Sequence, residues 1–277
     1  MTGTDDDPAS EVRNEAAGVF HGAFVQARSI GALHVHGHGP VWPVPRQLPP
    51  APRQFVNRAR EILQLDAMST GGAGEPGPAV LVVTGMHGVG KTATTRHWAS
   101  RNRERFGDGQ LYADFGALRH RGGVAVGEVL GGFLRAFGLS DEVIPVSLQE
   151  RAALYRSQTA DKRVLLLLDD VEHAAQVAPL IPNADDSVVL VTTRSSLEEL
   201  VRDGAGVVRL DPLDPLSASA MLAAMIGEER VAAESGPVAR LVEFCDGLPI
   251  ALRICGARSP GCWTSSPTRS IGLRGSA

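Results

Sequence analysis

The stretch that decides the fold of this chain is Gly85-Met86-His87-Gly88-Val89-Gly90-Lys91-Thr92. It satisfies the phosphate-binding pattern G-x-x-x-x-G-K-[ST] at every fixed position. The apolar, β-branched run 79–84 before it is typical of a buried parallel strand, and 93–100 after it can continue as a helix. Strand, glycine loop and helix in this order are the setting that the pattern requires, which disfavours a chance match in a glycine-rich turn.

This octapeptide predicts a site for the phosphates of a purine nucleoside di- or triphosphate. Its glycines let backbone N–H groups surround an anion, and the N-terminus of the following helix adds partial positive charge. Lys91 can then reach the outer phosphates, and the Thr92 hydroxyl can hold Mg²⁺. The residues expected to contact the nucleotide here are Gly85, Gly88, Val89, Gly90, Lys91, Thr92 and Ala93.

A second buried strand, expected over 163–169, ends in the two carboxylates Asp169 and Asp170. An aspartate at the carboxyl end of such a strand holds Mg²⁺ beside bound phosphates, usually through water, and we assign this role to Asp169. Asp170 can polarise an attacking water as a catalytic base, or it can cap the next helix. The sequence favours neither role for Asp170 over the other.

A third buried strand, over 187–193, is followed by Arg194. An arginine at that end of the sheet would face the γ-phosphate and distinguish a triphosphate from a diphosphate by charge. The alternative is a capping arginine on the surface. Two further strands, 110–115 and 207–210, fit the same sheet, and the pattern after Pro212 is only helical, with helices expected near 217–226, 236–245 and 248–257.

Composition agrees with a soluble, cytoplasmic protein. The net charge of −4 gives no electrostatic argument for nucleic acid or an anionic membrane. Three cysteines without a signal peptide indicate reduced thiols in the cytosol. No apolar run approaches the ~20 residues that span a bilayer.

Residues 1–54 are expected to be mostly disordered, with short strands within 19–38 and a proline-rich extended linker over 39–53. Four of the eight histidines lie in 21–38, and three of them are spaced two apart: His34, His36 and His38. On a strand these three would share one face. We favour a solvated face over a metal site because no cysteine or acidic ligand accompanies them.

The motifs at 85–92, 165–171, 190–194 and 247–249 (Gly-Leu-Pro) occur in the order and spacing of the NB-ARC family, so the chain resembles these signalling NTPases of the STAND group. The resemblance covers roughly 45–257. It implies an α/β P-loop NTPase of three layers, whose parallel five-stranded sheet has the order 2-3-4-1-5. It also implies a nucleotide domain over 55–210 and a small all-α subdomain over 211–258.

The resemblance further implies a switch more than a metabolic enzyme. Similar proteins hold ADP between the two domains, then open and assemble with partners or further copies after exchange for ATP, with at most slow hydrolysis. Pro249 would pack on the adenine, Val56 would offer it backbone hydrogen bonds, and Arg58 would lie close by. The implied cofactors are ADP or ATP with Mg²⁺. The family usually has Gly-Arg where this chain has Asn57 and Arg58.

The end of the chain departs from the family pattern. Members continue into a winged-helix domain, whereas here 259–277 is a Ser/Gly/Arg-rich tail that we expect to be disordered. We therefore expect an incomplete helical subdomain and a truncated module. Two other interpretations stay open: an active P-loop ATPase or kinase-like enzyme, and a remnant without function.

Overall fold

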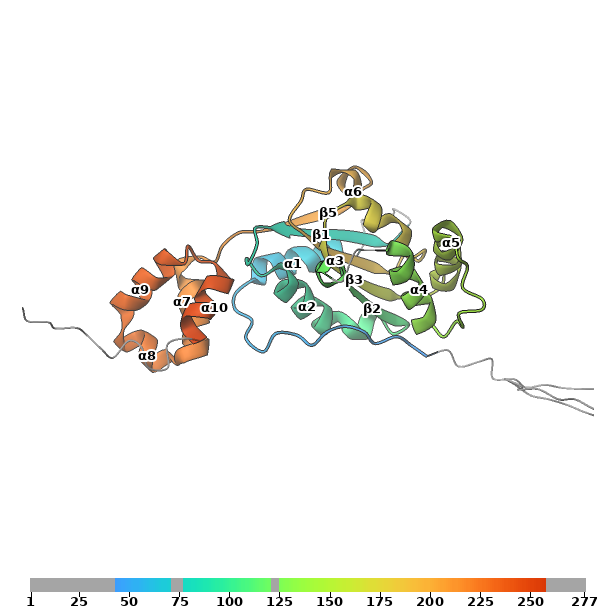
Figure 1. The fold of residues 1–277 in the computed structure, drawn as a ribbon. Helices are drawn as coiled ribbons and strands as arrows, with labels where there is room; N and C mark the ends of the chain where they lie inside the picture. The colour runs from blue at the N-terminus through green and yellow to red at the C-terminus, as the bar shows by residue number, and fades with distance from the viewer. Residues whose placement is uncertain (1–42, 71–76, 121–124, 258–277) are drawn as a thin grey trace, which may run out of the picture. The chain divides into compact units, whose positions relative to one another are not determined.

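A parallel five-stranded sheet forms the centre of the computed structural model, which describes residues 43–70, 77–120 and 125–257 (Figure 1). The strands are β1 (Ala79–Gly85), β2 (Gly109–Asp114), β3 (Val164–Val171), β4 (Val188–Thr193) and β5 (Gly206–Leu210). Their order is β2-β3-β4-β1-β5, as predicted. In this order β4 separates β1 from β3, and Leu190 of β4 lies opposite both Leu81 and Leu167.

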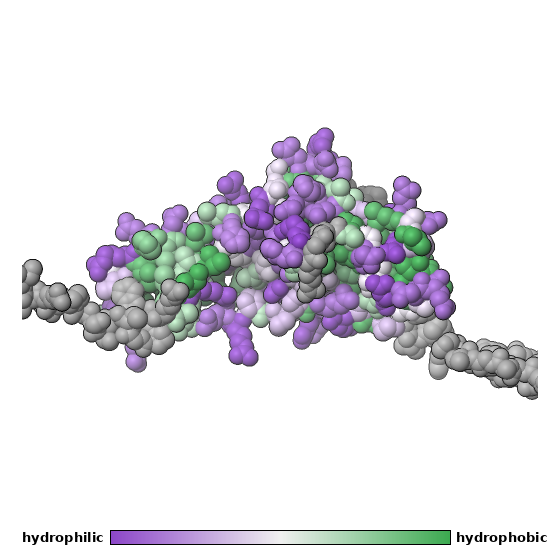
Figure 2. All heavy atoms as spheres, viewed as in Figure 1, coloured by the Kyte–Doolittle hydropathy of each residue, from purple (hydrophilic) through white to green (hydrophobic). Residues whose placement is uncertain are grey.

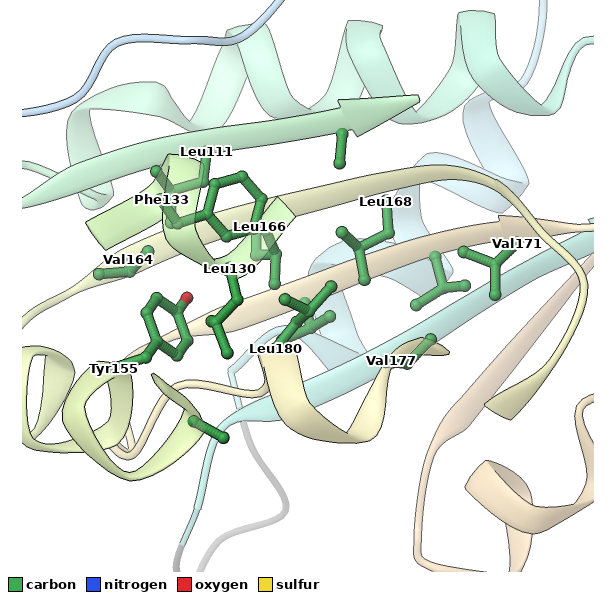
Figure 3. Packing of buried hydrophobic residues seen from close by; sticks show 14 of the residues in the cluster. Leu111, Leu130, Phe133, Tyr155, Val164, Leu166, Leu168, Val171, Val177 and Leu180 are labelled. Carbon is green, nitrogen blue, oxygen red and sulfur yellow. The ribbon is translucent and has the colours of Figure 1, made fainter. Parts of the chain in front are cut away.

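Both faces of the sheet are covered by helices, because the strands are apolar at successive positions rather than at alternate ones. On β3, Leu166 and Leu168 pack against α4 (Val126–Ala136) and α5 (Leu148–Thr159), as Figure 3 shows. Leu165 and Leu167 face the opposite side, which α1 (Ala59–Met68) and α2 (Lys91–Asn102) cover. All four leucines are fully buried, and each such burial contributes about 2 kcal/mol to folding.

Short elements lie in the connections that lead from one strand or long helix to the next. They are the helices α3 (Phe115–His120) and α6 (Glu198–Arg202) and the 3-10 turns Arg103–Arg105, Ala174–Gln176 and Ala178–Leu180. Helix α3 follows β2 without a loop, since the carboxylate of Asp114 accepts a hydrogen bond of 2.8 Å from the backbone N–H of Ala117. This abrupt turn places α3 at the carboxyl edge of the sheet. Helices α3, α4, α5, α6 and α8 add to the elements located from the sequence.

Four helices follow the sheet: α7 (Pro215–Ile226), α8 (Glu228–Ala233), α9 (Ser235–Phe244) and α10 (Pro249–Ala257). They enclose a small apolar core that includes Ala218, Leu222 and Leu252. Helix α7 begins where Asp214 accepts a hydrogen bond of 2.9 Å from the N–H of Ser217. Hydrogen bonds from Ser217 lower the pKa of the Asp214 carboxyl, as expected for an N-cap.

The proline-rich segment is partly docked. Gln110 of β2 donates its N–H to the Pro45 carbonyl at 2.8 Å, and its own carbonyl accepts from the Gln47 N–H at 2.8 Å. Residues 45–47 thus extend the sheet beside β2, although they precede the expected domain boundary at 54/55. The strands predicted within 19–38, the three closely spaced histidines and the tail 259–277 lie outside the described residues.

Apolar residues reach the surface in two places in Figure 2: on the helices after the sheet and beside α4 and α5. The first group includes Leu216, Phe244 and Ile254, and the second includes Val143, Val146 and Leu148. None of these six lines the pocket described below. Among the described residues, no helix has the length and apolarity needed to cross a membrane.

Candidate functional site

The carboxyl ends of β1, β3 and β4 meet at one edge of the sheet and open into a pocket of about 630 Å³. This is where open parallel α/β sheets bind ligands. The pocket brings together many predicted site residues that are distant in sequence. Those among its lining are Val56, Arg58, Gly88, Val89, Gly90, Lys91, Thr92, Ala93, Asp170, Arg194 and Pro249. Gly85 and Asp169 lie directly behind it and contact Lys91 and Thr92.

The glycine loop adopts conformations that other residues would resist. Gly90 has φ +104° immediately before α2 begins at Lys91. Gly85 has φ +148°, and a Cβ on it would lie 2.5 Å from the Leu210 carbonyl oxygen of β5. Gly85 therefore allows the close approach of β5 and supports the loop rather than lining the pocket.

Lys91 is folded back onto the loop that would hold the phosphates. Its Nζ donates hydrogen bonds to the carbonyl oxygens of Gly85 at 2.8 Å and Met86 at 3.0 Å. Burial lowers the pKa of Lys91, and the nearby Asp170 carboxylate opposes this effect. Lys91 as a residue is 9% exposed, and its ammonium lies beside the place where anionic phosphates would lie.

The two predicted Mg²⁺ ligands are in contact. Thr92 Oγ1 donates to Asp169 Oδ1 at 2.8 Å, and the Thr192 hydroxyl donates to the same oxygen. Hydroxyl and carboxylate oxygens are the ligands that Mg²⁺ prefers, with the remainder supplied by water and phosphate. Among the described residues no cluster of three His, Cys, Asp or Glu side chains could hold a metal.

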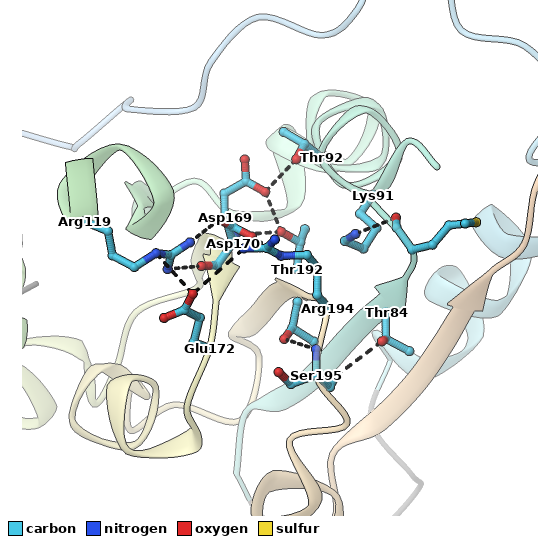
Figure 4. Close-up of polar contacts among 12 residues, drawn as sticks. Thr84, Lys91, Thr92, Arg119, Asp169, Asp170, Glu172, Thr192, Arg194 and Ser195 are labelled. Atoms are coloured by element: carbon cyan, nitrogen blue, oxygen red, sulfur yellow. Dashed lines mark hydrogen bonds and ion pairs between the residues drawn. The ribbon is translucent and has the colours of Figure 1, made fainter. Parts of the chain in front are cut away.

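Two carboxylates and two arginines form a charged cluster where the pocket meets the carboxyl ends of β3 and β4 (Figure 4). Asp170, at φ +55°, forms ion pairs with Arg119 and with Arg194, the latter at 3.5 Å. Glu172 pairs with the same arginines at 3.3 and 3.9 Å. The next helical turn is capped by His173, so the Asp170 carboxylate engages cations instead of a helix N-terminus.

The opposite end of the pocket is built around Arg58, which is 7% exposed. Its guanidinium donates to the Val89 carbonyl at 3.0 Å and pairs with Glu61 at 3.1 Å, so it fixes the glycine loop to α1. The preceding Asn57 has φ +38° and donates to the Ser217 hydroxyl. Asparagine is among the few side chains that tolerate such a left-handed backbone.

Helix α10 rests directly on the glycine loop. The Ile250 N–H donates to the Gly88 carbonyl at 3.2 Å. A Cβ on Gly88 would lie 2.3 Å from Ile250 Cγ2, and one on Gly90 would lie 4.0 Å from Pro249 Cγ. The Gly-Leu-Pro turn therefore brings the start of α10 against the loop that would hold the phosphates.

Some pocket residues were not identified from the sequence. The principal ones are Gln54, Phe55, Arg119, Ile250 and Arg253. Arg119 could have been suspected, because it lies just after a predicted strand, where the carboxyl edge of the sheet begins. The others come from segments whose local patterns carry no sign of a site.

Comparisons with known proteins agree with this description. The regulatory protein AfsR of Streptomyces coelicolor is 42% identical over 228 residues, which are 80% of this chain and 23% of that protein. AfsR of Streptomyces griseus is 39% identical over 224 residues, with the same coverage. The chain thus spans about a quarter of the length of these relatives. No family model matches it.

Among solved structures, the Walker-type ATPase PABY2304 of Pyrococcus abyssi superposes with a TM-score of 0.52 at 18% identity, covering 76% of this chain and 69% of that one. This likeness shows the fold alone. Together with the strand order and the similarity to AfsR, it confirms the resemblance to regulatory NTPases predicted from the motifs. A P-loop NTPase fold implies nucleotide binding.

Proposed function

We propose that this chain, a STAND-like P-loop NTPase similar to the regulatory protein AfsR, works as an adenine-nucleotide switch. In this proposal ADP occupies the pocket in the resting form, and exchange for ATP changes the arrangement of the helices that follow the sheet. Hydrolysis is slow at most. The regulatory role given in the description of AfsR supports a signalling function over a metabolic one.

The observation that carries the proposal is the contact between α10 and the glycine loop. The Ile250 N–H bonds to the Gly88 carbonyl, and the Gly88 backbone is also where phosphates would be bound. When a ligand takes up the loop's N–H groups, any shift of the loop acts directly on the first turn of α10. A bound nucleotide can therefore stabilise one position of α10 on the loop over another. A switch requires such a difference in contacts between its two conformations.

Each predicted residue has a role in this proposal. Lys91 leaves the loop carbonyls for the outer phosphates, and Thr92 with Asp169 holds Mg²⁺, which neutralises phosphate charge when bound. Arg194 contacts the γ-phosphate, and Asp170 orients water for slow hydrolysis. At the other end Pro249 packs on the adenine, while the Val56 backbone and Arg58 lie beside its edge.

The nucleotide content of the purified protein tests the proposal. The protein is denatured, and the released small molecules are separated by chromatography. About one equivalent of trapped ADP, which exchanges only slowly with added ATP, is the expected result.

Two other results would support the other interpretations. Fast, repeated release of phosphate from ATP would identify an active ATPase. A protein that is empty, binds neither nucleotide and aggregates would identify a remnant without function. Assembly with partners or with further copies of the chain after ATP binding is a further part of the switch proposal, and light scattering in each nucleotide would detect self-assembly.

A further inference from the structure

We propose that Arg119 is a positioning residue for the end of the pocket where a γ-phosphate would lie. It holds Asp170 and Glu172, so that these carboxylates do not form close ion pairs with Arg194. Arg194 then stays free to turn to a γ-phosphate. This inference rests on the proposed nucleotide switch and adds a determinant of ATP-over-ADP selectivity, supplied by a residue that the motifs do not contain.

All three guanidinium nitrogens of Arg119 contact residues at or just after the end of β3. One terminal nitrogen donates to the Asp170 backbone carbonyl at 2.7 Å, and the other donates to the Asp170 Oδ2 carboxylate oxygen. Its Nε faces Glu172 at 3.3 Å. Simultaneous contact with a carbonyl and two carboxylates uses the planar, forked shape of arginine, which lysine does not have.

Arg194 makes weaker contacts with the same two acids. Its nitrogens lie 3.5 Å from Asp170 Oδ1 and 3.9 Å from Glu172 Oε1, beyond hydrogen-bonding distance. The Arg194 side chain is half exposed, whereas that of Arg119 is 24% exposed. The acids are therefore held mainly by Arg119, and Arg194 can leave them at little cost.

The packing of α3 against β3 keeps Arg119, rather than Arg194, in close contact with Asp170 and Glu172. Gly116 lies one helical turn before Arg119, and a Cβ on it would lie 2.8 Å from Asp170 Oδ2 and 3.2 Å from Asp114 Oδ1. A side chain at this position would displace the Asp170 carboxylate that Arg119 holds, so glycine favours the close approach of α3. The geometry of Gly116 is thus a second, independent requirement for the same arrangement.

Removing Arg119 would change the electrostatic balance around Asp170. The cations that face Asp170 in the described part of the chain are Arg119, Arg194 and Lys91, and Lys91 is bonded to the loop carbonyls. Without Arg119, the two acids would draw Arg194 into close ion pairs. ATP would then have to break these pairs, whereas ADP, which lacks the γ-phosphate, would not.

The test compares the affinities of the purified full chain for ADP and for a non-hydrolysable ATP analogue, by calorimetry in the presence of Mg²⁺. We expect Arg119→Ala to weaken binding of the ATP analogue about tenfold, in line with the loss of one charge-assisted contact, and to leave ADP affinity unchanged. Arg119→Lys should recover only part of the loss, and Gly116→Ala should reproduce it. The matched control is Arg135→Ala, which removes a surface arginine that pairs with Asp141 outside the pocket.

The Arg194→Ala background separates positioning from direct contact. There, Arg119→Ala should have no further effect on the ATP analogue, because the residue that it positions is gone. A further loss in this background would mean that Arg119 binds the phosphate itself, and an equal loss of ATP analogue and ADP would mean a merely structural role. Either result would overturn the inference. If the wild-type chain binds neither nucleotide, the proposed function fails instead.

Discussion

Thr92 Oγ1 and Asp169 Oδ1, which lie 77 positions apart in the sequence, are joined by a hydrogen bond of 2.8 Å. The bond joins the first helical turn after the glycine loop to the carboxyl end of β3. If a divalent cation bound here with phosphates, this hydrogen bond would break. The Thr92 hydroxyl and the Asp169 carboxylate would then hold the cation, directly or through water. This contact is the arrangement that the proposed Mg²⁺ site requires of its two side-chain ligands.

Replacing Asp169 by alanine should remove the dependence of nucleotide affinity on Mg²⁺. The Thr92 hydroxyl then loses its carboxylate partner, and the cation loses its negatively charged ligand, while Lys91 still attracts the phosphates. We expect weak ADP binding that is the same with Mg²⁺ and with a chelator, measured by calorimetry. An Asp169→Ala variant whose ADP affinity still rises with Mg²⁺ would speak against this ligand.

Replacing Lys91 by alanine should abolish nucleotide binding. The variant removes the buried cation that faces the phosphates, and no other lysine lines the pocket. Binding of a fluorescent ADP analogue would measure the loss. The apolar core does not depend on the Lys91 ammonium, so the variant should melt at the same temperature as wild-type protein from which nucleotide has been removed. Wild-type affinity in the variant would refute the assignment.

Replacing Arg194 by alanine should weaken ATP more than ADP, by ~1–3 kcal/mol, since only ATP offers a γ-phosphate for a charge-assisted contact. Calorimetric titration with ADP and with a non-hydrolysable ATP analogue gives the two losses. Equal losses for both nucleotides would rule out the γ-phosphate role.

Nucleotide affinity should fall at alkaline pH because of Lys91. Burial holds the pKa of the free protein's Lys91 below its ordinary value of 10.5. Bound phosphates stabilise the charged ammonium and raise this pKa, so between the two values binding takes up a proton. Affinity is therefore full below the lowered pKa and declines as the pH rises through it. Calorimetry in buffers with different ionisation enthalpies would detect the proton uptake, and its absence throughout the alkaline range would contradict the prediction.

Replacing Tyr155 by phenylalanine should stabilise the fold. Tyr155 is fully buried between α4 and the sheet, and its hydroxyl has no hydrogen-bond partner among the described residues. Removal of an unsatisfied polar atom should raise the free energy of unfolding by about 1 kcal/mol. The contrasting control is Tyr112→Phe, which loses a hydrogen bond of 2.9 Å from Arg96 and should lower it. A lower melting temperature for Tyr155→Phe would show that the hydroxyl is satisfied.

Much of the architecture follows from local patterns. The octapeptide 85–92 and the apolar runs before 85, 170 and 194 predicted three of the strands, and the runs 110–115 and 207–210 predicted the other two. With the family resemblance they also predicted the strand order. Strand signals of this kind are local, because a strand buried on both faces must be apolar at consecutive positions. The short helix α3 was not located because six residues carry too little periodicity.

The sequence by itself determined the set of strands and the glycine loop. It also predicted roles for Lys91, Thr92 and Asp169 from their types and their positions after the strands. The tertiary structure alone decided that Arg119 holds Asp170 and that Ile250 rests on Gly88. These pairs join segments 51 and 162 positions apart. The sequence around one residue of each pair does not indicate the other residue. Contacts between segments so far apart depend on how the strands align and on where each helix begins.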